Sequence, residues 1–201
     1  MSINLVKGQK IDLTKSNAGL SSILVGLGWD PAERSGGGML GGLFGGKTAQ
    51  VDCDASVLLL DSNNKLRSKA DLIYFGNLRN QNSSIIHQGD NLTGDGEGDD
   101  EQILLDLNNI PQEIQKAIFV VNIYDCVKRK QDFGMIKNAF IRIVDATGNK
   151  ELCKYNLTES YAGKTTLVVG EIYRHGSEWK FGAIGEGTNE PGLREIVARY
   201  Q

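Results

Sequence analysis

The sequence predicts an all-β protein with a few short helices, arranged as a β-sandwich or a barrel. Most apolar segments are short, rich in β-branched residues and bounded by turn residues, which is typical of that architecture. Segments with helical periodicity are few. The 201 residues include 25 glycines and only 3 prolines, a composition that suits a chain with many turns.

The predicted strands follow one another at close intervals along the chain. They are residues 22–28, 57–60, 71–75, 84–87, 103–107, 117–124, 139–144, 152–155, 165–174 and 178–182. The last two flank His175, Gly176 and Ser177, so they are expected to pair as a hairpin with a short turn.

Two segments carry helical signals. Pro111 stands where a helix could begin, but only one or two turns fit before the next strand. At the C-terminal end, Leu193, Ile196, Val197 and Tyr200 recur at the spacing of one helical face, which predicts a closing helix over residues 192–201.

A glycine-rich segment at about residues 32–50 interrupts the strand pattern. The stretch from Gly36 to Gly46 (GGGMLGGLFGG) has seven glycines in eleven residues, which favours neither a strand nor a helix. Its apolar side chains are unusual for a plain linker, and they suggest self-association or contact with a membrane surface. They are Met39, Leu40, Leu43 and Phe44.

The totals exclude several classes of protein. A formal net charge of −3 does not provide the basic field that general nucleic-acid binding needs. Three separated cysteines, with no CxxC pair, favour buried reduced thiols over a disulfide framework or a zinc site. No run reaches the ~18 apolar residues of a membrane span, and the N-terminus lacks the apolar core of a signal peptide. These features predict a cytoplasmic protein.

A phosphate-loop pattern occurs inside the glycine-rich segment. Residues 41–48 (GGLFGGKT) match G-x-x-x-x-G-K-[ST], and an apolar run ending in Asp61 follows. A functional loop needs a strand before it and a helix after it, so that backbone N–H groups face the phosphates. The sequence predicts neither. Too few residues lie between Thr48 and the predicted strand at 57–60 for a helix and its connections. A nucleotide site is therefore not expected.

The strongest local signal is the acidic segment at residues 89–102 (GDNLTGDGEGDDEQ), which contains six acids and no Lys or Arg in fourteen residues. Such crowded carboxylates repel one another, so an ordered form needs a counter-charge. Calcium accepts six to eight oxygen ligands with flexible geometry. The glycines between Asp95, Glu97 and Asp99 would let the backbone turn its own carbonyls inward.

Other interpretations of this segment are weaker or stay open. An EF-hand is excluded because Leu92, Gly94 and Asp95 stand where that motif has two ligands and its glycine. A plain solvated loop and an enzyme with paired carboxylates remain as alternatives. Neither histidine has a partner at catalytic or metal-ligand spacing, and His87 is expected to be structural.

Short landmark sequences lie along nearly the whole chain. In order they are LVKG, DLT, VGLGWD, DCDAS, YFGNL, GDNLTGDGEGDDE, FVVNIY, FG, AFIRIV, YNLTE and GEIYRHGSEWKFGAIGEG. Together they resemble the TerD family of tellurium-resistance and general stress proteins. The acidic segment and the GEIYRHGSEWKF hairpin are the most specific of these. The sequence departs from the family pattern between residues 32 and 50, where most members have a shorter connection.

The resemblance implies a single-domain, two-sheet β-sandwich over residues 1–201 that binds calcium, as two ions, and has no enzymatic activity. It implies a bacterial cytoplasmic protein of the tellurite-resistance and stress response, with related proteins as partners at the inner membrane surface. Asp54 is a further candidate ligand on a strand face. The calcium ligands carried over are Asn77, Asp90, Asn91, Asp95, Glu97, Asp99, Asp100 and Glu101. The alternatives are a metal-dependent enzyme acting on phosphate esters or oxyanions, and a self-assembling structural protein.

Overall fold

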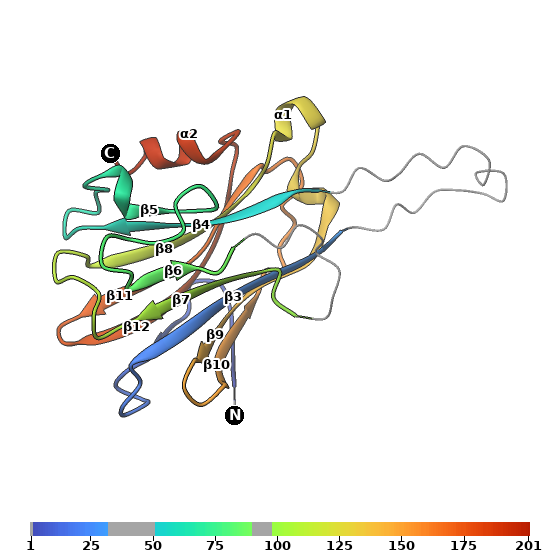
Figure 1. The fold of residues 1–201 in the computed structure, drawn as a ribbon. Helices are drawn as coiled ribbons and strands as arrows, with labels where there is room; N and C mark the ends of the chain where they lie inside the picture. The colour runs from blue at the N-terminus through green and yellow to red at the C-terminus, as the bar shows by residue number, and fades with distance from the viewer. Residues whose placement is uncertain (1, 32–50, 90–97) are drawn as a thin grey trace.

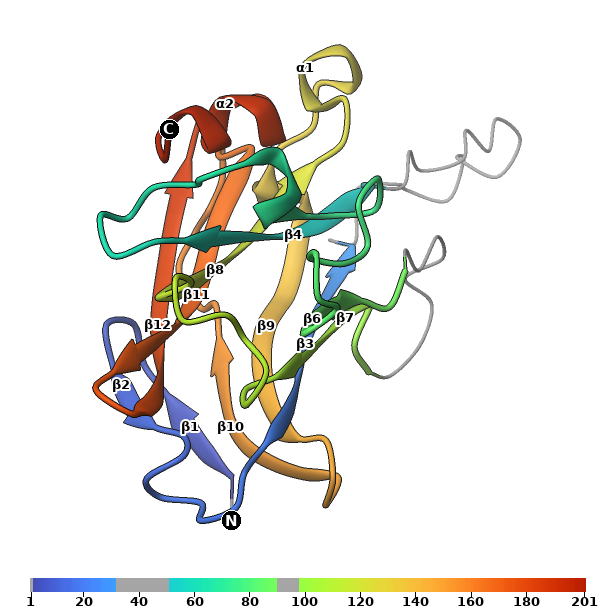
Figure 2. The same cartoon turned by 60° about the vertical axis from the view of Figure 1, so that its left-hand side comes forward.

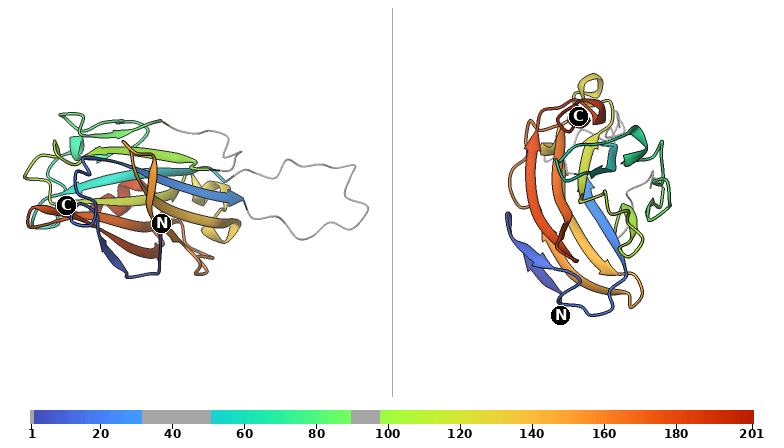
Figure 3. Two further views of the ribbon diagram at one scale, coloured as in Figure 1. Left: turned by 90° about the horizontal axis from the view of Figure 1, so that it is seen from below. Right: turned by 90° about the vertical axis from the view of Figure 1, so that its left-hand side faces the viewer.

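The computed structural model describes residues 2–31, 51–89 and 98–201, and these form two six-stranded sheets packed face to face (Figure 1). The first sheet has the strand order β1-β10-β9-β3-β7-β6, and the second has the order β2-β12-β11-β8-β4-β5. The two layers are seen edge-on in the right-hand view of Figure 3. The predicted all-β class is confirmed.

Every predicted strand is present, several with different ends. The strands are β1 (Ile3–Leu5), β2 (Lys10–Asp12), β3 (Ser22–Pro31), β4 (Cys53–Leu60), β5 (Leu72–Ile73), β6 (Ile85–His87), β7 (Glu101–Asp106), β8 (Lys116–Ile123), β9 (Ile136–Asp145), β10 (Lys150–Asn156), β11 (Thr166–His175) and β12 (Glu178–Thr188). The predicted hairpin is β11 paired antiparallel with β12. The short, largely exposed strands β1 and β2 were not predicted from apolar runs, because three residues show no periodicity.

The helices are short, as predicted. They are α1 (Cys126–Arg129), α2 (Leu193–Ala198) and the 3-10 turns η2 (Lys69–Asp71) and η3 (Phe133–Met135). A turn stands at Pro111, where the sequence left room for only one or two helical turns: Ile114 N–H donates to Pro111 O, and β8 begins at Lys116. The closing helix is confirmed but covers fewer residues than predicted.

Each sheet contributes one face to the main core. Val25 and Leu27 of β3 and Val57 and Phe119 of the other sheet are buried between the layers. Burial of such side chains stabilises the fold by about 1.5–3 kcal/mol each. All three cysteines are buried and free, which confirms their predicted reduced state.

A second apolar cluster lies on the outer face of the second sheet, where α2 covers it (Figure 2). Ile196 and Val197 of α2 pack there against Leu58, Leu60 and Val120. Among the described residues, no helix has the length and apolar character needed to cross a bilayer. The glycine-rich segment and the phosphate-loop pattern lie outside the described residues.

Candidate metal centre

The described end of the acidic segment, Gly98 to Glu101, runs onto the first sheet beside β3. Two glycines of the VGLGW sequence make room for it: a Cβ on Gly26 would lie 2.3 Å from the carboxyl atoms of Asp99, and one on Gly28 would lie 2.8 Å from Gly98 O. Val25 and Leu27, the alternate residues of the same strand, face the core. The alternation of bulky and glycine residues therefore gives β3 one packed face and one bare face.

Asp99 lies over the bare face, between two polar side chains of the neighbouring strands. Gly26 pairs in register with Arg142 of β9 and with Gln102 of β7. The Arg142 guanidinium donates two hydrogen bonds to the Asp99 carboxylate, from Nε at 2.7 Å and from Nη2 at 3.0 Å. Gln102 Nε2 donates a third, at 3.1 Å.

This ion pair supplies the Asp99 carboxylate with a counter-charge from the protein itself. The Asp99 side chain is 0% exposed, and its hydrogen bonds raise the pKa of Arg142 above its ordinary value. Arg142 is 43 residues distant in sequence, so a search within the segment could not have found it. Bidentate arginine–carboxylate pairs are among the stronger polar contacts in proteins.

Asp100 has a different environment. Trp29 N–H donates to Asp100 Oδ2 at 2.6 Å, next to a register shift between Gly28 and Asp30 in the pairing of β3 with β9. Burial raises the pKa of Asp100, and the nearby charges of Asp30 and Asp99 raise it further, while the Trp29 hydrogen bond lowers it. Among the described residues, neither Asp100 nor Asp30 forms an ion pair. Within the described part of the chain, no cationic side chain therefore compensates their charges.

Glu101 points into the sandwich and contacts His87. The His87 Nε2 atom lies 2.7 Å from Glu101 Oε2 and 3.2 Å from Ala55 O. Gly89 N–H donates to His87 Nδ1, so the imidazole proton is on Nε2, which donates to Ala55 O. His87 is 2% exposed and fully engaged, in agreement with its predicted structural role.

Asn77, another predicted ligand, is not brought to this cluster. Asn77 Nδ2 donates to Leu72 O at 2.7 Å, and Asn77 lines a groove beside Leu193 of α2. Asp90, Asn91, Asp95 and Glu97 lie outside the described residues. Asp30 was missed as a candidate, although its position at the end of a glycine-containing strand was a usable signal.

The described acids offer the right type of ligand atom for a metal ion, but too few of them for a complete site. Asp30 and Asp100 supply hard carboxylate oxygens, which is the ligand type that calcium prefers. Within residues 2–31, 51–89 and 98–201, no group of three or more His, Cys, Asp or Glu side chains is arranged to hold a metal. The described residues therefore fit calcium in kind, and a complete site would need oxygens from the rest of the segment.

Comparison with known proteins adds three findings. The TerD domain matches residues 1–200. The stress response protein SCP2 of Bacillus subtilis (strain 168) is 60% identical over 200 residues, covering 100% of both chains. The tellurium resistance protein TerD of Serratia marcescens is 41% identical over 200 residues, covering 100% of this chain and 97% of that protein.

A solved structure supports the fold. A homologue of the telluride resistance protein TerD from Streptomyces coelicolor A3(2) superposes with a TM-score of 0.62 at 20% identity. The match covers 86% of this chain and 92% of that chain. At this level of identity the likeness concerns the fold alone.

Proposed function

Because this chain belongs to the TerD family of tellurium-resistance and stress-response proteins, we propose that it is a calcium-binding, non-enzymatic binding or scaffold module. The observation that carries the calcium proposal is that Asp100, at the end of the acidic segment, feels the charge of Asp30 in β3, and neither carboxylate has an ion pair among the described residues. A bound divalent cation would neutralise both, which relieves the repulsion that raises the pKa of Asp100.

In this proposal the chain's own residues position the cation rather than activate a substrate. Trp29 N–H and the Arg142–Asp99 pair hold the end of the segment against the first sheet. The one histidine near the acids has both ring nitrogens engaged, so it is poorly placed to act as a general base. His87 therefore gives no support to the metal-dependent enzyme alternative.

The apolar side chains of the glycine-rich segment suggest contacts with partners. We propose related TerD-family proteins as partners, with self-association or peripheral contact with the inner membrane through Gly36 to Gly46. A cytoplasmic location goes with this proposal. Deletion of residues 36–46 should abolish self-association in sedimentation experiments or binding to lipid vesicles. Unchanged behaviour in both assays would exclude the segment as a contact.

Calcium is expected to stabilise the protein by mass action. At a calcium concentration tenfold above Kd, the gain is about 1.4 kcal/mol, or roughly 3–6 °C in Tm for a chain of this size. Thermal unfolding with calcium and with chelator measures it. The Asp100→Asn variant should lose most of the shift. The matched control is Asp106→Asn, at the other end of β7, and it should keep the full shift. Equal melting curves with calcium and with chelator would contradict the proposal.

A pH dependence follows from the raised pKa of Asp100 in the absence of calcium. Below the ordinary carboxyl pKa, Asp100 is protonated in both the folded and the unfolded states, so it costs no stability. As the pH rises through the folded-state pKa, the folded state must hold an unfavourable charge, and stability falls. In chelator, Asp100→Asn should therefore gain stability relative to wild type between pH 4 and pH 7. Urea titrations at both pH values measure the difference, and a constant or reversed difference would contradict this assignment.

A further inference from the structure

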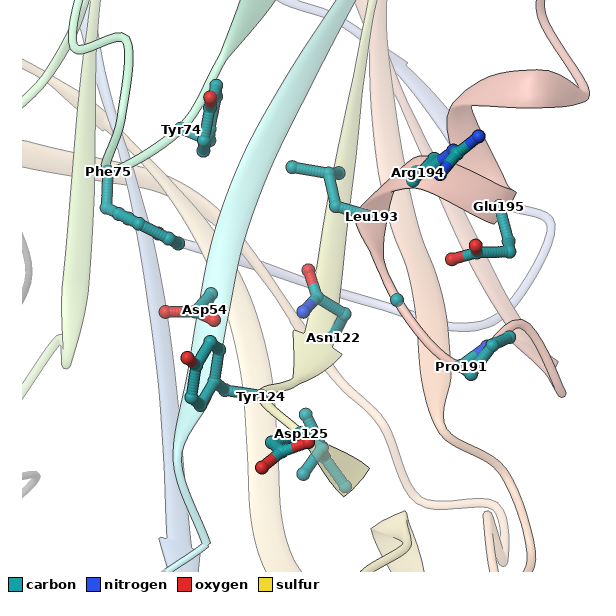
Figure 4. Close-up of a pocket in the computed structure, with 12 residues that line it drawn as sticks. Asp54, Tyr74, Phe75, Asn122, Tyr124, Asp125, Pro191, Leu193, Arg194 and Glu195 are labelled. Carbon is teal, nitrogen blue, oxygen red and sulfur yellow. The ribbon is translucent and has the colours of Figure 1, made fainter. Parts of the chain in front are cut away.

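A second cavity lies on the outer face of the second sheet, beside the start of α2 (Figure 4). Its volume is about 300 Å³, at the lower end of the range for small-molecule pockets. It lies between β4, β8, the turn after β5 and the segment from Pro191 to Glu195. All of its lining residues belong to the described part of the chain.

The floor of this pocket is polar, and one of its buried oxygen atoms lacks a hydrogen-bond partner. Asp54 of β4 and Asn122 of β8 are paired in register, and each is only 6% exposed. The Asn122 side-chain oxygen is buried and has no hydrogen-bond partner among the described residues. Buried polar atoms almost always have a partner, because leaving one unpaired costs about 1–3 kcal/mol. A hydrogen-bond donor on a ligand would supply the one that the fold lacks.

The walls of the pocket carry negative charge. Asp125 and Glu195 join Asp54 among the lining residues, against one basic residue, Arg194. Figure 4 shows the Glu195 carboxylate turned toward Asn122 and the Arg194 side chain turned away from it. The field inside the pocket therefore favours a cation that can also donate hydrogen bonds.

Aromatic rings surround the mouth. Phe75 and Tyr124 are 50% and 49% exposed, and Tyr74 packs edge-on against Phe75 at a centroid distance of 5.3 Å. The Arg129 guanidinium lies 5.1 Å from the Tyr124 ring centroid, so one face of this ring already makes a cation–π contact. Exposed aromatic rings attract organic cations by cation–π interaction, and they also make apolar contacts with methylene groups.

We propose that this pocket binds a small organic cation, namely a primary ammonium group on a short alkyl chain. The ammonium would lie between Asp54 and Glu195 and donate to the Asn122 oxygen, while its methylenes would contact Phe75 and Leu193. A metal ion fits less well, because the acids of this pocket do not form a group arranged to hold one. The pocket lies on the second sheet, whereas Asp99, Asp100 and Glu101 lead into β7 of the first. The proposal is therefore independent of calcium binding.

The test is calorimetric titration of the full-length protein with 1,5-diaminopentane in chelator and low salt. We expect one binding event with a Kd below about 1 mM, weakened by added salt and absent with the neutral 1,5-pentanediol. Glu195→Gln removes an exposed acid and should weaken binding at least fivefold without affecting folding. Asn122→Leu should weaken it at least tenfold. The matched control is Glu178→Gln, at the end of β12 that is distant in sequence from α2. It should change the affinity for the diamine less than twofold.

Three outcomes would overturn the proposal. The first is no binding at millimolar diamine. The second is diamine binding that Glu195→Gln leaves unchanged. The third is calcium binding that depends on Glu195 while the diamine does not bind, which would make the pocket a metal site.

Discussion

Replacing Arg142 with methionine is expected to lower the free energy of unfolding by about 3 kcal/mol, or roughly 6–12 °C in Tm. The substitution leaves the fully buried Asp99 carboxylate with one neutral donor, Gln102. Removing one partner of a buried pair costs more than the pair itself contributes, because the remaining charge is left uncompensated. The lower end of the usual range applies here, because the Arg142 side chain is 31% exposed and water reaches the vacated space.

Chemical denaturation at pH 7 measures this cost. The double variant with Arg142→Met and Asp99→Asn should recover part of the loss, since a neutral amide costs less to bury than a carboxylate. The matched control is Arg199→Met, because Arg199 pairs at the surface with the exposed Glu186 at 3.0 Å and the half-buried Glu190 at 3.7 Å. Surface pairs of that kind contribute about 0–1 kcal/mol. If Arg142→Met lowers the free energy of unfolding no more than Arg199→Met does, the Arg142–Asp99 pair does not hold the end of the acidic segment on the first sheet.

Gly26→Ala is expected to be comparably damaging, at about 3 kcal/mol, although it adds only one methyl group. That methyl would lie 2.3 Å from Cγ and both oxygens of Asp99, so the carboxylate must leave its two hydrogen-bonded neighbours. The cost therefore combines overpacking with loss of the Arg142 pair. We also expect calcium to bind more weakly to this variant, because the end of the acidic segment is displaced from Trp29 and Asp30.

A double-mutant cycle separates these causes. In an Asp99→Ala background the obstruction is absent, so adding Gly26→Ala should cost little, with a coupling energy of about 1–3 kcal/mol. The control glycine is Gly182 on β12, where a Cβ would meet Glu171 at an ordinary 3.4 Å. Additive effects of the Gly26 and Asp99 substitutions would show that the glycine serves another purpose.

The strand positions were predictable because burial leaves a periodic trace in the sequence. Apolar runs such as 117–124 and 139–144 correspond to β8 and β9, which have buried neighbours on both sides. The second half of β12, Ala183–Thr188, contains glycines and no apolar run, and it is a strand through its pairing with β11. A strand defined by its partner rather than by its own side chains cannot be read from composition.

The acidic segment was found from its charge density, and its hard-oxygen chemistry was readable from residue types alone. Three features that organise its described end were not readable. Arg142 and Gln102 reach Asp99 because both are neighbours of Gly26 in the sheet. The charge of Asp30, at the end of β3, raises the pKa of Asp100, which directly precedes β7. Each depends on strand order and register, which bring together residues distant in sequence.

By itself, the sequence determined the all-β class, the closing helix, the burial of the cysteines and the resemblance to the TerD family. These follow from local periodicity, residue chemistry and motif order, all of which are properties of short segments. Only the tertiary structure decided that Asp99 is neutralised by Arg142, a residue distant in sequence. It also revealed the pocket of Asp54 and Asn122, two residues on different strands that become neighbours only when β4 pairs with β8. The physical reason is that the charge and solvation of a side chain depend on what surrounds it in space, and sheet pairing sets those surroundings across long sequence separations.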